Sequence, residues 1–197
     1  MAEPAAARLT LATAFARRAV RLAILTATVV LVACAGFLAY AYHRLPIWAA
    51  VVYATAPISN PVGRVLATHK SLSVESCPVE SFDITSPLQF LVSAMQDKSA
   101  DRQRLQQIFA HFQDVGCDIN GLWNGRAAIH DAVLYGDPAV VSYLMTRGAD
   151  PDIRMQPPAR RAGLDAHEYA ELACRAKTNY DCAAIRKALA PVPLATS

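Results

Sequence analysis

Hydrophobic residues follow one another without a charge from Leu22 to Tyr42, a run of 21 residues near the start of the chain. As an α-helix, such a run is about 31 Å long, which matches the roughly 30 Å hydrocarbon core of a bilayer. The run predicts one transmembrane helix over residues 22–42. It follows a basic N-terminal segment, residues 1–21, whose charged residues are Glu3, Arg8, Arg17, Arg18 and Arg21.

The charges on either side of this helix predict its orientation. Arginines cluster before it, whereas only His43 and Arg44 follow closely, so the positive-inside rule puts residues 1–21 in the cytoplasm. Everything after Tyr42 is then expected outside. A composition rich in Ala and Arg favours a bacterial inner membrane, with the C-terminal part in the periplasm. Aromatic side chains are common at the outer interface, where we expect Tyr40, Tyr42 and Trp48.

Two other interpretations of the same segment stay open. Ala39-Tyr40-Ala41 has the small-x-small form of a cleavage site, although the apolar run is long for a cleaved signal. Leu31-Val32-Ala33-Cys34 resembles the lipobox of bacterial lipoproteins, although apolar residues follow Cys34 instead of a polar tether. All three interpretations export the rest of the chain.

The segment 43–82 predicts a membrane-proximal region followed by a linker. Its apolar stretch after Pro46 is too short to cross a bilayer again, and further prolines interrupt it. We expect part of this segment to lie on the membrane surface.

Further along the chain, the apolar spacing becomes that of amphipathic helices. Ile129, Ala132 and Val133 recur at i, i+3 and i+4. Val140, Val141 and Leu144 form a second stripe. Between the stripes lies Gly136-Asp137-Pro138, in which glycine ends one helix and Asp-Pro begins the next. The pattern predicts a helical hairpin.

This hairpin and its flanks, residues 124–154, resemble one ankyrin repeat over their whole length. Ala127 and Ala128 depart from the family, which usually has Thr and Pro there. His130 stands at the family's turn histidine, and the resemblance implies that it hydrogen-bonds between repeats. The matching positions are Gly125, Ile129, His130, Ala132, Gly136, Val140, Val141, Tyr143, Leu144 and Gly148-Ala149-Asp150.

A single repeat cannot bury both of its faces, so neighbours are expected on each side. Upstream, residues 86–88 resemble a repeat start. Downstream, residues 163–170 resemble another, followed by a last helix that contains Ile185 and Leu189. The resemblance implies an all-α fold, a short ankyrin-like helical-hairpin solenoid of about three repeats. It covers residues 83–190, after the one transmembrane helix and before a tail at 191–197.

Four cysteines follow the transmembrane helix, and an even number in an oxidising compartment permits disulfides. Cys174 and Cys182 flank the insertion between the helices of the last repeat and form one candidate pair. Cys77 and Cys117 form the other. Buried free thiols are the alternative.

The remaining side chains favour binding over catalysis. From residue 75 onward, 12 Lys or Arg face 15 Asp or Glu, a difference of −3, so we expect no nucleic-acid partner. The five histidines are scattered, and the sequence has no hydrolase, phosphate-loop or zinc motif. We expect no enzymatic activity, no metal, no cofactor and no small-molecule substrate.

Ankyrin domains hold protein partners with their hairpin tips and the concave face of their first helices. Carried over to this chain, the resemblance implies a partner surface, although Trp123 and Tyr135 could instead pack within the domain. An insertion containing Pro157, Pro158, Arg160 and Arg161 is either a recognition loop or a solvated spacer. The implied partner-binding residues are Trp123, Asn124, Arg126, Leu134, Tyr135, Arg147 and Arg154.

The expected function is a membrane-anchored protein–protein interaction module displayed in the periplasm. Two roles fit it: an immunity protein that neutralises a secreted toxin, or a factor that protects a periplasmic or membrane enzyme. The alternative is an assembly subunit that acts through its transmembrane helix, at small residues such as Ala33, Ala35 and Gly36.

Overall fold

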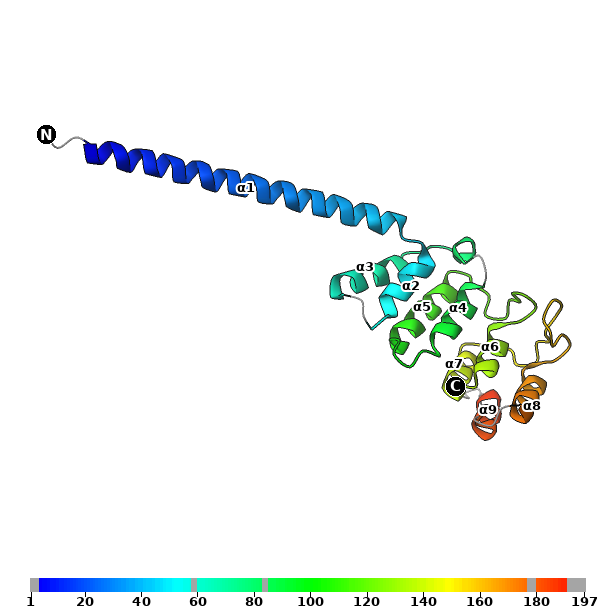
Figure 1. The fold of residues 1–197 in the computed structure, drawn as a ribbon. Coiled ribbons are helices and arrows are strands. Elements are labelled where there is room, and N and C mark those ends of the chain that lie inside the picture. Colours follow the sequence, from blue (N-terminus) through cyan, green and yellow to red (C-terminus); the bar gives the residue numbers. More distant parts are fainter. Residues whose placement is uncertain (1–3, 58–59, 83–84, 177–179, 191–197) are drawn as a thin grey trace, which may run out of the picture. The chain divides into compact units, whose positions relative to one another are not determined.

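The computed structural model describes residues 4–57, 60–82, 85–176 and 180–190, which are helical with connecting turns (Figure 1). The tail expected at 191–197 lies outside the described residues. The chain forms two compact units, Met1–Leu45 and Pro46–Ser197. The all-α fold class is confirmed, and one helix at the start of the chain is long and apolar enough to cross a membrane.

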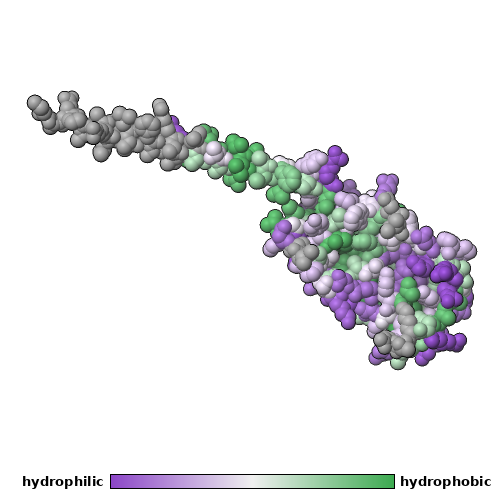
Figure 2. Space-filling view, in the orientation of Figure 1, coloured by the Kyte–Doolittle hydropathy of each residue, from purple (hydrophilic) through white to green (hydrophobic). Residues whose placement is uncertain are grey.

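The first unit is one long helix, α1 (Pro4–Arg44). Its part from Ala23 to Arg44 has the length and composition of a membrane span, although a signal sequence would meet the same criteria. Large apolar side chains along it are exposed, for example Val29 at 67% and Phe37 at 70%. Hydrophobic residues follow one another along this stretch (Figure 2). The predicted apolar helix is therefore present.

At the centre of the second unit is the predicted hairpin, α6 (Ala128–Tyr135) and α7 (Pro138–Thr146). The Asp137 carboxylate accepts hydrogen bonds from the backbone N–H groups of Ala139 and Val140, which caps α7, and Pro138 occupies its first turn. Both predicted stripes are buried. The hairpin is therefore specified by its turn and by its apolar spacing together.

The hairpin before it consists of α4 (Pro87–Ala94) and α5 (Arg102–Asp114). Ser86 and Asp101 cap the two helices through their side-chain oxygens. The two helices contribute some of the largest fully buried side chains of the domain. These are Leu88, Leu91, Met95, Leu105, Ile108, Phe109 and Phe112.

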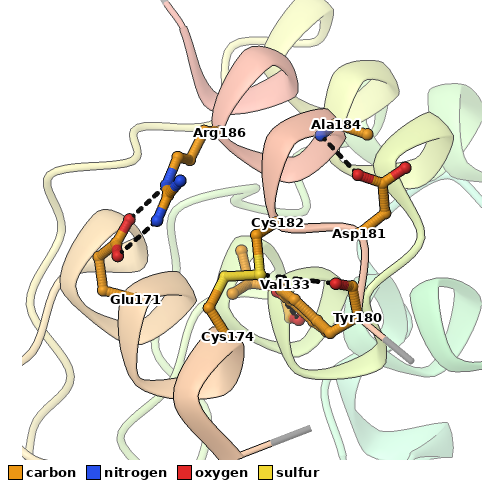
Figure 3. Close-up of a disulfide and its surroundings, with 8 residues drawn as sticks. All are labelled: Val133, Glu171, Cys174, Tyr180, Asp181, Cys182, Ala184 and Arg186. Carbon is orange, nitrogen blue, oxygen red and sulfur yellow. Dashed lines mark hydrogen bonds and ion pairs between the residues drawn. A yellow bond between two sulfur atoms is a disulfide. The ribbon is translucent and has the colours of Figure 1, made fainter. Parts of the chain in front are cut away.

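The last hairpin consists of α8 (Ala166–Ala176) and α9 (Cys182–Leu189). Asp165 and Glu168 cap the start of α8 reciprocally, each carboxylate accepting the other residue's backbone N–H. At the other end, the Cys174–Cys182 disulfide joins the two helices, and Arg186 on α9 pairs with Glu171 on α8 (Figure 3). This terminal hairpin is thus held by cross-links as well as by its core.

The segment 43–82 differs from the expected linker. It contains a further hairpin, α2 (Ile47–Thr55) and α3 (Pro61–Ser71), and then the short 3-10 helix η1 (Val79–Ser81). Helix α2 packs against both α3 and α5. Its buried residues are Ala49, Ala50, Val51, Ala54 and Thr55, which bring the helices close together through small side chains.

Polar contacts fix the same hairpin to α5. The Arg104 guanidinium donates to the Ala54 carbonyl at 2.9 Å, and the Asp101 N–H donates to the Thr55 carbonyl at 3.0 Å. The Cys77–Cys117 disulfide then ties the chain after α3 to the end of α5. The folded domain therefore begins at α2, well before residue 83.

One continuous apolar core runs from Val51 on α2 to Leu189 on α9. The first helices of the last three hairpins pack in order, α4 on α6 and α6 on α8, while α7 packs on α9. The four hairpins thus follow one another from α2–α3 to α8–α9, as in a solenoid (Figure 1).

Candidate partner-binding site

A tight turn before α6 begins the site. Trp123 and Arg126 exchange both backbone hydrogen bonds, at 2.8 and 3.1 Å, around the central residues Asn124 and Gly125. Both central residues have positive φ, 49° and 76°, which is the geometry that Asn-Gly favours in a two-residue hairpin. Arg126 follows the turn, and its Nε lies 3.1 Å from the carboxylate of Asp131 on α6.

The insertion between α7 and α8 folds back onto this turn. Residue Met155 is buried and exchanges backbone hydrogen bonds with Leu164 and Gly163, so the base of the loop is closed. The N–H of Gln156 donates to the carbonyl of Gly125 at 2.8 Å. The loop is therefore held at its base, while residues 156–158 and 160–163 are exposed.

These pieces enclose a pocket of about 600 Å³. Its walls come from the turn and α6, from the insertion, and from α8. The lining combines three arginines, three apolar residues and a tyrosine. The lining residues are Arg126, Leu134, Met155, Ala159, Arg160, Arg161 and Tyr169.

The pocket is electropositive. None of the described residues that line it is acidic, and no ion pair between described residues involves Arg160 or Arg161. Arg126 is the exception, because its Nε lies 3.1 Å from the Asp131 carboxylate. Arg160 and Arg161 therefore have no ion-pair partner among the described residues.

Burial shifts the pKa of two groups near the pocket. It raises the pKa of Asp131, an effect that the adjacent Arg126 partly opposes. It also raises the pKa of Tyr169, so the phenol in the pocket wall stays neutral at physiological pH and can donate a hydrogen bond. The pocket thus offers charged and neutral donors over an apolar surface, which suits a carboxylate carried on a peptide.

The turn, α6, α7 and the start of the insertion correspond to a known family. Residues 124–156 match the family model described as the ankyrin repeat. These residues are an ankyrin repeat. No curated protein and no solved structure matches the chain.

The resemblance implies that His130 hydrogen-bonds between repeats, but both of its bonding partners, Ala127 and Ile153, lie within the matched repeat itself. Its side chain is fully buried. Nδ1 accepts the backbone N–H of Ala127 at 3.0 Å, and Nε2 donates to the Ile153 carbonyl at 2.9 Å. This pattern requires the neutral ring, and burial lowers the pKa of His130 accordingly. His130 joins the start of α6 to the beginning of the insertion.

Among the residues implied as partner-binding, the structure brings Arg126 and Leu134 together in the pocket. Tyr135 follows on the same helix and is 47% exposed, and its hydroxyl donates to Ser93 on α4 at 3.2 Å. Asn124 is exposed at the tip of the turn. Of these four residues, only Arg126 and Leu134 belong to the pocket lining.

The other three implied residues lie apart from the pocket lining. Trp123 is half-buried against the Cys77–Cys117 disulfide in a smaller cavity. Arg147 hydrogen-bonds Gln113 at the end of α5. Arg154 pairs with Asp165 and Glu168 and so helps to close the loop base. They support the fold of the repeat rather than the pocket.

Three lining residues, Met155, Ala159 and Tyr169, were not expected from the sequence. Tyr169 lies on α8 in the next hairpin, and only folding brings it to α6. Among the described residues, no group of three or more His, Cys, Asp and Glu is arranged to hold a metal ion.

Proposed function

We propose that this chain is a membrane-anchored protein-binding module and that its arginine pocket receives an acidic segment of a partner protein. Ankyrin repeats generally mediate protein–protein binding, and the chain contains one. The proposal rests on the pocket, which Arg126, Arg160 and Arg161 line together with apolar residues.

The pocket can hold a carboxylate by charge-assisted hydrogen bonds, since an arginine fork binds it through two parallel N–H···O bonds. Arg160 and Arg161 are exposed, so solvent weakens these bonds. Leu134 and Met155 supply apolar area beside the charges, which a purely electrostatic patch lacks. Arginine and tyrosine are also frequent in binding hot spots.

For localisation, we propose the bacterial inner membrane, with the N-terminus cytoplasmic and the domain in the periplasm. The arginines before α1 support this orientation. Two disulfide pairs in the second unit support an oxidising compartment. The mass of the protein after extraction from membranes tests whether α1 is retained, cleaved, or lipidated at Cys34.

Two biological roles fit a module of this kind. It either acts as an immunity protein that neutralises a secreted toxin, or it protects a periplasmic or membrane enzyme. In both, the module binds and catalyses nothing itself, without a cofactor. A second candidate is an assembly subunit whose binding element is α1, supported by the exposed small residues Ala33, Ala35 and Gly36.

The test is site-specific photo-crosslinking in membranes that contain the full chain. A photoreactive residue at Leu134 is expected to capture one protein, which mass spectrometry identifies. The same residue at exposed Gln107 on α5 serves as the control. Capture at Gln107 but not at Leu134 would overturn the proposed site.

Charge variants then test the pocket. Replacing Arg160 and Arg161 by Gln is expected to reduce capture about threefold to tenfold, since each exposed ion pair contributes up to about 1 kcal/mol. The control replaces exposed Arg175 and Lys187 by Gln, which makes the same change of net charge away from the pocket. Equal losses of capture in both variants would show that the partner responds to net charge and not to the pocket. Exchanging α1 for an unrelated membrane helix abolishes function only if the second candidate is right.

A further inference from the structure

Exposed large apolar side chains in the folded domain are concentrated on its first hairpin. Among the described residues of the second unit, the ones outside this hairpin are Val79 and Tyr135. Over α2 and α3, Figure 2 shows hydrophobic residues at the surface, whereas hydrophilic ones predominate toward α8. We call the following set the α2–α3 apolar surface: Trp48, Val52, Tyr53, Val62, Val65, Leu66 and Leu72.

The spacing on α3 shows that this exposure is systematic. Val62, Val65 and Leu66 stand at i, i+3 and i+4, and His69 and Leu72 continue the stripe at i+7 and i+10. All five are exposed, with Val65 at 68%. The side of α3 that meets the core instead presents Ala67 and Ser71. The larger apolar side chains of α3 are therefore exposed, and Val65 and Leu72 also line a shallow pocket with Arg104 of α5.

The charge of the region is one-sided. Residues 43–74 contain Arg44, Arg64 and Lys70 but no Asp or Glu, and the first acidic residue after them is Glu75. A surface that combines apolar and aromatic side chains with basic ones, and without acidic ones, complements anionic lipid headgroups.

Chain length limits where this surface can lie. Helix α2 begins at Ile47, three residues after Arg44, the last residue of the apolar span. Three extended residues reach about 11 Å at most. If α1 is an uncleaved anchor, the start of α2 therefore stays close to the headgroup zone, and its effective concentration at the lipid surface is high.

We propose that the α2–α3 apolar surface lies in the headgroup region of the membrane that holds α1. The proposal rests on the anchoring proposed above, and its occupant is anionic lipid. The first hairpin of the solenoid then contacts the surface of the bilayer. Trp48 and Tyr53 would lie where amphipathic rings are favoured.

The test uses the full chain in nanodiscs of phosphatidylethanolamine and anionic phosphatidylglycerol, with brominated lipids as fluorescence quenchers. The chain has two tryptophans, Trp48 and Trp123. Both are replaced by Phe, and a single reporter is introduced as Val65→Trp on α3. The matched control carries Ser142→Trp, at an exposed position of α7.

We expect roughly a twofold loss of emission from the α3 reporter and little loss from the α7 control. Replacing Arg64 and Lys70 by Gln, or exchanging phosphatidylglycerol for phosphatidylcholine, should reduce the quenching of the α3 reporter. Equal quenching of the two reporters in discs that contain the protein would overturn the inference. So would an α3 reporter that is shielded only when two copies share a disc.

Failure of the anchor gives a different result. A chain whose first helix does not hold it in lipid is not retained in the nanodiscs as an integral membrane protein, whatever the quenching at α3. Incorporation without quenching at α3 therefore refutes the surface while leaving the anchor intact.

Discussion

Two hairpins of similar size, α6–α7 and α2–α3, are stabilised in opposite ways. The ankyrin repeat α6–α7 buries its large apolar residues and is fixed by local turns and by fully buried His130. The α2–α3 hairpin buries mainly alanines and exposes its larger apolar residues. It is fixed to the domain by long-range contacts, from Arg104 and from the Cys77–Cys117 disulfide.

The difference shows what each hairpin depends on. A hairpin held by its own turns keeps its shape as long as its local residues are intact, since capping bonds and glycine conformations act within a few residues. A hairpin that buries small side chains gains less from apolar burial, which scales with area. It should therefore be more sensitive to the loss of distant cross-links. The predictions below test this contrast.

The largest effect is expected from the disulfides. The Cys77–Cys117 bond closes a loop of 40 residues and Cys174–Cys182 one of 8. Loop-closure entropy then gives about 4 kcal/mol for the first and about 2.5 kcal/mol for the second. Paired Cys→Ser variants of the detergent-solubilised chain, unfolded in urea, measure both. Equal losses of unfolding free energy would show that loop length does not decide the ranking.

The next effect belongs to the turn before α6. Gly125 has φ 76°, and a Cβ placed there would lie 1.8 Å from the Gln156 carbonyl oxygen. Gly125→Ala should thus destabilise the domain by about 3 kcal/mol, from left-handed strain and overpacking together. Gly116 is the control, because its φ is 96° but nothing lies within 4 Å of a Cβ. Gly116→Ala should cost only about 1 kcal/mol in the same urea titration. Similar losses of unfolding free energy for the two variants would show that the clash with Gln156 does not contribute.

The same contrast explains why the sequence predicts α6–α7 but not α2–α3. The ankyrin repeat was predictable because Gly136, Asp137 and Pro138 mark its turn and its stripes have helical spacing. The α2–α3 hairpin was not, because Ala49, Ala50 and Val51 are consecutive rather than periodic, and its apolar residues face outward. From sequence alone, such a segment is indistinguishable from one that lies on a membrane.

The candidate site was predictable only in part for a related reason. Arg126 and Leu134 follow from their place in the repeat. The pocket, however, needs the insertion to fold back through the Gln156–Gly125 bond and needs Tyr169 from the next hairpin. These contacts join residues far apart in the chain, and no local pattern encodes them. The same holds for Arg147 and Arg154, whose carboxylate partners only the structure identifies.

A smaller effect is expected from His130, and it depends on pH. Burial lowers the pKa of His130 below its ordinary value of 6.5. Between this lowered pKa and pH 6.5, the unfolded chain is protonated at His130 and the folded chain is not. The stabilising contribution of the neutral ring is therefore complete above pH 6.5 and is lost as the pH falls through the lowered folded-state pKa.

The variant His130→Gln makes this measurable. At pH 7.5 it should be less stable than the wild type by about 2 kcal/mol, because two buried hydrogen bonds are disturbed. The difference should shrink toward pH 5.5. Subtracting the two urea profiles cancels the contribution of Asp131, whose raised pKa acts in the opposite direction. A difference that does not change with pH would contradict the neutral-ring assignment.

The smallest effect tests the attachment of α2. Arg104 donates to the Ala54 carbonyl at 2.9 Å from a side chain that is 28% exposed. Arg104→Met keeps most of the aliphatic stem but removes this bond, and should destabilise the domain by about 1 kcal/mol. Hydrogen exchange should locate the loss, because amides of α2 and α3 then exchange faster while those of α6 and α7 do not. Faster exchange in both hairpins would mean that α2–α3 is not a separately opening unit, and that the domain unfolds as one.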